Sequence, residues 1–158
     1  MRSPRCLLLA NAGMIGRTPN ETASIDPAIW IQTVTLNALA PMKLAQEFRE
    51  HVARSELKRM VAISTVKASL QLSQSNDPTY RASKAALNAG WRSMALNVKE
   101  RGISCILFHP GWVQTDMGGP NAPVTRQDSV SGMMALIDKM TPETTGEFRN
   151  FDGESIPW

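Results

Sequence analysis

The chain has 158 residues, of which 42% are hydrophobic and 20% charged, and its formal net charge is +3. This length and composition are typical of one globular domain and exclude a disordered chain. The basic residues are scattered, which argues against a nucleic-acid-binding surface. The apolar runs are too short for a membrane span, and the start lacks the long apolar core of a signal peptide. We therefore expect a single domain over residues 1–158 of a soluble, cytoplasmic protein.

The first predicted element is the apolar strand CLLLA, residues 6–10, which ends at a polar turn. A short strand that is apolar throughout is typical of one buried on both faces of a sheet. A helix is then expected over 29–54, interrupted or kinked near Pro41, because apolar side chains recur at four-residue spacing in its second half. The next predicted strand is RMVAIST at 59–65.

The following segment contains the best-defined helix of the sequence. A polar loop ending in Asp77-Pro78 is a plausible helix entry, and the helix is predicted over 79–100. Gly102 then ends it, since glycine readily adopts the left-handed conformation that closes many helices. The apolar strand ISCILFH is predicted next, at 103–109.

The last part of the chain continues the alternation with a helix over about 126–140 and a strand over 147–153. Short apolar strands that alternate with helices favour a parallel sheet covered on both faces. The sequence therefore predicts an α/β fold built on a doubly wound parallel sheet.

The two cysteines, Cys6 and Cys105, lie inside predicted strands and have no CxxC or histidine-rich neighbour. They are expected to be reduced, buried thiols rather than a disulfide or a metal site. No group of His, Cys and carboxylate residues has the spacing of metal ligands, so no metal is expected.

Candidate functional residues follow the strands, because ligands of open parallel sheets bind beyond the carboxyl ends of the strands. Tyr80 and Lys84 begin the helix after the second strand and, four residues apart, share one helical face. The residues directly after the three strands are Asn11, Ala12 and Gly13, then Ser64 and Thr65, and then Pro110, Gly111 and Thr115.

The Tyr80–Lys84 pair can perform proton transfer. A tyrosine has an ordinary pKa near 10 and is a poor acid or base at neutral pH. A neighbouring ammonium favours the phenolate and lowers that pKa. The pair would then donate a proton to a carbonyl that is becoming an alcohol.

Five motifs in order resemble the short-chain dehydrogenase/reductase family, in its C-factor-like and sniffer-type carbonyl reductase branch. The resemblance covers essentially the whole chain. The motifs are Asn11-Ala12-Gly13, Asn37 in VTLNALAP, Ser64 in VAIST, Tyr80 and Lys84 in YRASKAALN, and the segments HPGWVQTDMGGPNA at 109–122 and GEFRNFDGESIPW at 146–158.

The resemblance implies a partial Rossmann-like fold and an oxidoreductase that uses NADP or NAD to interconvert a carbonyl and an alcohol. Tyr80 would be the general acid and base, and Lys84 would lower its pKa and bind the nicotinamide ribose. Ser64, or Thr65 as the alternative, would hydrogen-bond the substrate oxygen, and Asn37 would hold a water in a proton relay. The residues bordering the cofactor would be Asn11, Ala12, Gly13, Tyr80, Lys84, Pro110, Gly111, Val113 and Thr115.

The family's opening strand, TGxxxGxG turn and pyrophosphate-binding helix do not occur in this sequence. The chain corresponds to the C-terminal part of the family's domain, as a truncated form would. We therefore expect NADP or NAD to bind weakly or not at all. The strand at 6–10 is expected to leave an exposed apolar edge, which invites pairing with another chain.

Two functions remain open from the sequence. The first is a short-chain dehydrogenase that retains the catalytic half and acts on a small-molecule carbonyl or alcohol. The second is a non-catalytic remnant that acts as an interaction or dimerisation protein. In either case a homo-oligomer is expected through the helices near 29–54 and 79–101, with no nucleic-acid or membrane partner.

Overall fold

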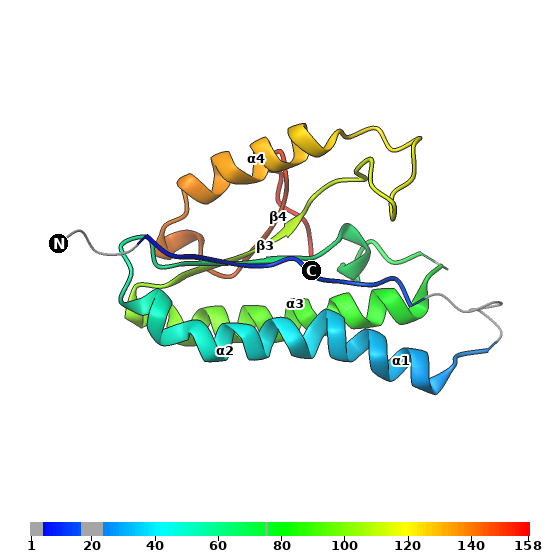
Figure 1. The fold of residues 1–158 in the computed structure, drawn as a ribbon, viewed down its shortest axis with the longest axis horizontal. Coiled ribbons are helices and arrows are strands. Elements are labelled where there is room, and N and C mark those ends of the chain that lie inside the picture. The colour runs from blue at the N-terminus through cyan, green and yellow to red at the C-terminus, as the bar shows by residue number, and fades with distance from the viewer. Residues whose placement is uncertain (1–4, 17–23, 75) are drawn as a thin grey trace.

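The four predicted strands pair side by side in one parallel sheet, in the order β1-β2-β3-β4. This arrangement is seen in a computed structural model that describes residues 5–16, 24–74 and 76–158 (Figure 1). The predicted parallel α/β sheet is thus confirmed. The strands are β1 (Leu7–Ala10), β2 (Arg59–Ile63), β3 (Ser104–His109) and β4 (Glu147–Asn150).

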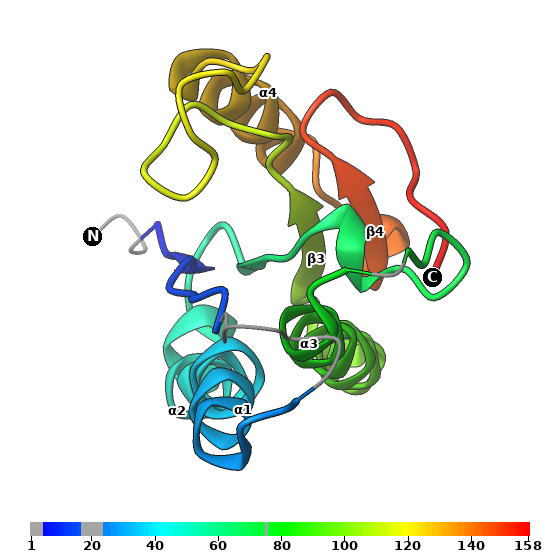
Figure 2. The same cartoon turned by 90° about the vertical axis from the view of Figure 1, so that its right-hand side faces the viewer.

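Helices cover both faces of the sheet, as Figure 2 shows. One face packs against α1–α3 through a core that includes Met60, Leu87 and Trp91, and the other packs against α4 through Val61 and Ile137. Adjacent strand residues serve opposite cores because side chains alternate along a strand. The helices are α1 (Pro27–Val34), α2 (Ala40–Ala53), α3 (Pro78–Val98) and α4 (Arg126–Asp138), with 3₁₀ turns at Val66–Ala68, Lys99–Arg101 and Pro142–Thr144.

The predicted interruption of the first long helix is a π-helical segment, Thr35–Leu39, between α1 and α2. It lies just before Pro41, which has no N–H to donate to the carbonyl of Asn37 four residues earlier. The Ala40 N–H instead donates to the carbonyl of Thr35, five residues back. Such π segments are frequent at functional sites, and this one contains Asn37.

Both ends of α3 lie where the sequence predicted them. The helix begins at Pro78, directly after Asp77, whose backbone has a left-handed conformation with φ 49°. The terminal 3₁₀ turn is capped by Gly102 with φ 72°, a conformation that glycine adopts without steric cost. The helix therefore carries the segment from Tyr80 to Asn88 in regular geometry along the sheet.

The two edges of the sheet differ. β1 pairs only with β2 among the described strands, and its Leu9 side chain is 47% exposed, as the sequence led us to expect of an apolar edge. β4 is covered by the end of the chain, because the Ile156 N–H donates to the Phe148 carbonyl at 2.9 Å and Ser155 pairs with Arg149. Within the described residues, the β1 edge is therefore the open one.

The two thiols are free, and they differ in burial. Cys105 lies in the core, where burial raises the pKa of its thiol to about 12. Cys6 is only half-buried, because β1 is an edge strand. Among the described residues, no helix is both long and apolar enough to cross a membrane.

Candidate active site

The carboxyl ends of β1, β2 and β3 meet the first turns of α3 and the π-helical segment at one edge of the sheet. This follows from the parallel registers, which align Ala10, Ala62 and Leu107 across the three strands. The side chains of Lys84, Asn37 and Tyr80 are grouped at this edge.

Lys84 lies under the turn that follows β1. Its Nζ donates to the Ile63 carbonyl at 2.9 Å, and a Cβ added at Gly13 would lie only 3.4 Å from the same atom. The side chain is 3% exposed, and this burial lowers the pKa of the ammonium to about 8. Gly13 thus keeps the space above a buried cation free of side-chain atoms.

Asn37 ties the π-helical segment to the turn after β1. Its Oδ1 accepts from the Met14 N–H at 2.8 Å, and its Nδ2 donates to the Met14 carbonyl at 2.7 Å. The same Nδ2 donates to Ser83 Oγ at 2.9 Å, and the Ser83 hydroxyl donates to the Tyr80 carbonyl. The buried amide therefore connects β1, the π segment and α3 at one point.

Tyr80 is in a different electrostatic state from the one that the sequence suggested. Burial and the nearby Asp77 carboxylate raise the pKa of its phenol, and a hydrogen bond with the Thr65 side chain acts in the opposite direction. Lys84 was expected to lower this pKa. Its Nζ instead donates to the Ile63 carbonyl. In this structure Tyr80 is a neutral phenol at physiological pH.

The two candidate hydroxyls after β2 point to different places. Ser64 is 3% exposed, and its Oγ donates to Asn88 Oδ1 at 2.6 Å. Thr65 carries the hydroxyl that hydrogen-bonds Tyr80, and it also accepts from the Lys67 N–H. Side chains of consecutive extended residues point to opposite sides, so only one of the two hydroxyls can face the phenol.

The predicted cofactor-bordering residues form two groups. Asn11, Ala12 and Gly13 are exposed directly after β1, beside Asn37 and Lys84. The second group, after β3, is held by its own loop contacts and by α4. Pro110 accepts from Ser129 Oγ at 2.6 Å, Gly111 has φ 86°, Val113 pairs with Val124, and exposed Thr115 accepts from the Gly118 N–H.

The sequence reasoning missed four residues of this edge: Met14, Asp77, Ser83 and Asn88. Ser83 and Asn88 could have been found from helical spacing, because they lie three and eight residues after Tyr80. Asp77 forms an ion pair with Lys67 and raises the pKa of Tyr80. Met14 acts through its backbone, which gives no signal in the sequence.

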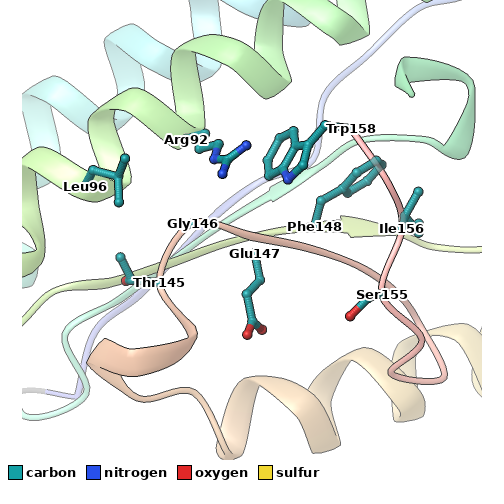
Figure 3. A pocket seen from close by; sticks show the side chains of 9 residues that line it. All are labelled: Arg92, Leu96, Thr145, Gly146, Glu147, Phe148, Ser155, Ile156 and Trp158. Atoms are coloured by element: carbon teal, nitrogen blue, oxygen red, sulfur yellow. The ribbon is translucent and has the colours of Figure 1, made fainter. Parts of the chain in front are cut away.

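A separate shallow pocket lies between α3 and the end of the chain (Figure 3). The guanidinium of Arg92 stands 4.4 Å from the centre of the Trp158 ring in it. None of the predicted site residues lines this pocket. Its lining consists of Arg92, Leu96, Thr145, Gly146, Glu147, Phe148, Ser155, Ile156 and Trp158.

The burial of Lys84 makes a prediction about stability. The difference between its usual pKa of 10.5 and the value of about 8 corresponds to roughly 3 kcal/mol against the folded state below pH 8. Between pH 8 and 10.5 the unfolded chain binds more protons at this group, so stability rises with pH there. The Lys84→Met variant is expected to be more stable than the wild type at pH 7, although the loss of the hydrogen bond to the Ile63 carbonyl reduces the gain. The stability advantage of the variant should shrink by pH 10. Urea unfolding at both pH values measures it, and an advantage independent of pH would rule out the buried ammonium as its cause.

Comparisons with known proteins show the family and the fold of the chain. The family described as short chain dehydrogenase matches residues 6–124. The chain is 37% identical over 156 residues to the C-signal of Myxococcus xanthus, an alignment that covers 98% of this chain and 93% of that protein.

Solved structures of carbonyl reductases share the fold. The carbonyl reductase Sniffer of D. melanogaster matches with a TM-score of 0.88 and 28% identity, over 96% of this chain and 66% of the reductase. An NADPH-bound carbonyl reductase from chicken fatty liver matches with a TM-score of 0.86 and 30% identity, over 99% and 67%. The chain therefore spans about two thirds of the length of these reductases. The family model matches residues 6–124, and the sequence and the sheet match C-signal and Sniffer. The chain therefore belongs to the short-chain dehydrogenase family, in the branch of C-signal and Sniffer.

Proposed function

We propose that this chain carries the proton-transfer half of an NAD(P)-dependent reaction that interconverts a carbonyl and an alcohol. The observation that supports it is the grouping of the Tyr80 phenol, the Thr65 hydroxyl and the buried Lys84 ammonium at one edge of the sheet. A small-molecule substrate and a cytoplasmic location belong to the same proposal.

The residues present fit the nicotinamide end of such a cofactor. Glycine at position 13 leaves the Lys84 ammonium and Asn37 Oδ1 more approachable than a residue with a side chain would, since a Cβ there would lie 3.4 and 3.3 Å from them. A buried ammonium that donates to the Ile63 carbonyl has further N–H groups to donate to ribose hydroxyls. Bound NADPH or NADH would supply the hydride.

Tyr80 is the proton donor in this proposal. Its raised pKa keeps the phenol protonated, which suits donation to an oxygen that gains charge as a carbonyl is reduced. Thr65 is the partner hydroxyl at the same oxygen, because its side chain already meets the phenol of Tyr80. Ser64, the first choice from the sequence, is bound to Asn88 instead.

Lys84 would supply a proton in addition to the ribose contact. With a pKa near 8 it is largely protonated at neutral pH, and it can return a proton to the Tyr80 side of the site during turnover. Asn37 fixes the turn above it through Met14, so the cation and the glycine face each other in one orientation. Orientation of this kind is the protein's main contribution to hydride-transfer reactions.

Cofactor affinity tests the part of this proposal that assigns the ribose contact to Lys84. The sequence lacks the TGxxxGxG turn that binds the pyrophosphate in the family, so NADPH and NADH are expected to bind weakly or not at all. Isothermal titration calorimetry of the purified 158-residue chain measures this, with Lys84→Met as the control that removes the ribose contact. Micromolar binding by the wild type would contradict the expected weakness. Measurable binding by the wild type that is equally strong in the variant would contradict the role of Lys84.

A non-catalytic interaction protein is the second candidate. The M. xanthus relative supports this candidate, because its name, C-signal, describes a signal rather than an enzyme and the alignment covers 93% of its length. The homo-oligomer proposed through α1–α3 has apolar side chains to use, since Ile31, Leu39 and Leu96 are more than half exposed. Light scattering coupled to gel filtration is expected to give a mass above 17.3 kDa. A strictly monomeric chain at micromolar concentration would contradict this assembly.

A further inference from the structure

A hydrogen bond beneath the active-site edge connects β2 to α3. The Ser64 N–H donates to the Phe108 carbonyl at 2.7 Å, which extends the sheet one residue beyond β2. The Ser64 hydroxyl donates to Asn88 Oδ1 at 2.6 Å, and both side chains are 3% exposed. The end of β2 is thus fixed by its backbone to β3 and by its side chain to α3.

This contact determines where the next residue points. Thr65 is extended, with φ −157° and ψ 149°, so its side chain leaves the backbone on the side opposite to that of Ser64. With Ser64 held against α3 below the edge, the Thr65 hydroxyl is directed to Tyr80 above it. A rotation of Ser64 out of its contact would turn Thr65 away as well.

Helix α3 contacts the end of β2 at regular intervals. Tyr80, Lys84 and Asn88 are spaced four residues apart on one face of the helix. Tyr80 meets Thr65, Lys84 meets the carbonyl of Ile63, and Asn88 meets Ser64. Ile63, the last residue of β2, and the two residues that follow it are therefore each contacted by one residue of this helical face. Lys84 and Asn88 are equally buried, each 3% exposed.

We propose that Asn88 is a positioning residue which, by accepting the Ser64 hydroxyl, fixes the end of β2 so that Thr65 is presented to Tyr80. The orientation itself follows from the contacts above, and its value for catalysis rests on the proposed function. Asn88 Nδ2 is buried and has no hydrogen-bond partner within the part of the chain that the structure describes. A buried amide that uses only one of its groups is costly for stability, which suits a residue retained for position.

Tyr80 allows a direct test, because it is the only tyrosine of the chain. The ¹³Cζ resonance of labelled tyrosine therefore reports on this phenol alone, without any need for turnover. Thr65→Val is expected to raise the pKa of Tyr80 by about 0.5–1 unit, since the hydrogen bond that favours the phenolate is lost. Ser64→Ala and Asn88→Leu are expected to raise it similarly, and the double variant no further than either single one.

Ser55→Ala is the matched control. Ser55 is 2% exposed and its hydroxyl donates to the Val52 carbonyl, away from the site. It should lose a comparable amount of thermal stability and leave the ¹³Cζ titration of Tyr80 unchanged. A Tyr80 titration that moves in Thr65→Val but stays at the wild-type position in Ser64→Ala and Asn88→Leu would overturn the proposal, and so would additive shifts in the double variant.

A kinetic measurement separates this inference from the proposed function. If the wild type reduces carbonyls, Asn88→Leu should lower kcat several-fold with KM little changed, because the substrate-binding loop is untouched. If the wild type shows no turnover while the coupled Tyr80 titrations are observed, the proposed function fails and the positioning role of Asn88 stands. If turnover is observed and the Tyr80 titrations are not coupled, the positioning role of Asn88 fails and the proposed function stands.

Discussion

Tyr80→Phe is expected to lower the rate of NADPH-dependent carbonyl reduction by about 10²–10⁴-fold, the usual contribution of a general acid. The substitution removes only the hydroxyl, and the ring keeps its packing at the start of α3. Because the cofactor is expected to bind weakly, the rate is measured as NADPH oxidation at high cofactor concentration with an aromatic aldehyde as substrate.

Two measurements make this result specific. The melting temperature of Tyr80→Phe should remain near that of the wild type, since the phenol is half-buried and the substitution breaks one hydrogen bond, to the Thr65 side chain. Thr65→Val should lower the rate less, because Tyr80 remains to donate the proton. Equal rates in wild type and Tyr80→Phe would remove the phenol from the reaction and leave the interaction protein as the better candidate.

Trp91→Ala is expected to reduce the free energy of unfolding by about 3–5 kcal/mol. Trp91 is fully buried on α3 and is one of the largest side chains of the core between that helix and the sheet. A loss of this size is a large fraction of the stability of an ordinary domain. Urea unfolding followed by circular dichroism measures it at about 25 °C, a temperature at which the wild type is expected to be folded.

Trp112→Ala is the matched control for this experiment. Its ring is 56% exposed, in the loop after β3, and its Nε1 donates to the Gly118 carbonyl at 2.7 Å. The same change of residue should therefore cost about 1 kcal/mol there. Similar urea midpoints for the two variants would mean that the packing of α3 on the sheet does not limit the stability of the chain.

Much of the fold could be predicted from the sequence because β1, β2 and β3 are short apolar runs and α3 has a signal at each end. β4, with the sequence EFRN, is not an apolar run and was expected from the alternation of elements. Pro78 and Gly102 bracket α3 as expected, and Arg126–Asp138 lies within the predicted range. The helix interruption was expected near Pro41 and occurs at Thr35–Leu39. The proline acts on the carbonyl four residues before it, so the effect appears upstream of its cause.

The site was less accessible to prediction, since its chemistry depends on which way side chains point. Ser64 and Thr65 are adjacent hydroxyls in the sequence, and only the burial of Ser64 against Asn88 distinguishes them. The phenol of Tyr80 was expected to be acidic because Lys84 lies one turn away. Burial and Asp77 reverse that, and neither follows from the spacing of the motif.

The unequal edges of the sheet limit how copies of this chain could join by strand pairing. At β4 the returning chain already occupies the outer hydrogen-bonding groups, and Pro157 follows it directly. Among the described strands only β1 offers a free edge, so two chains that pair through it would each use their one available edge. Strand addition of this kind joins two copies and leaves no further open edge among the described strands.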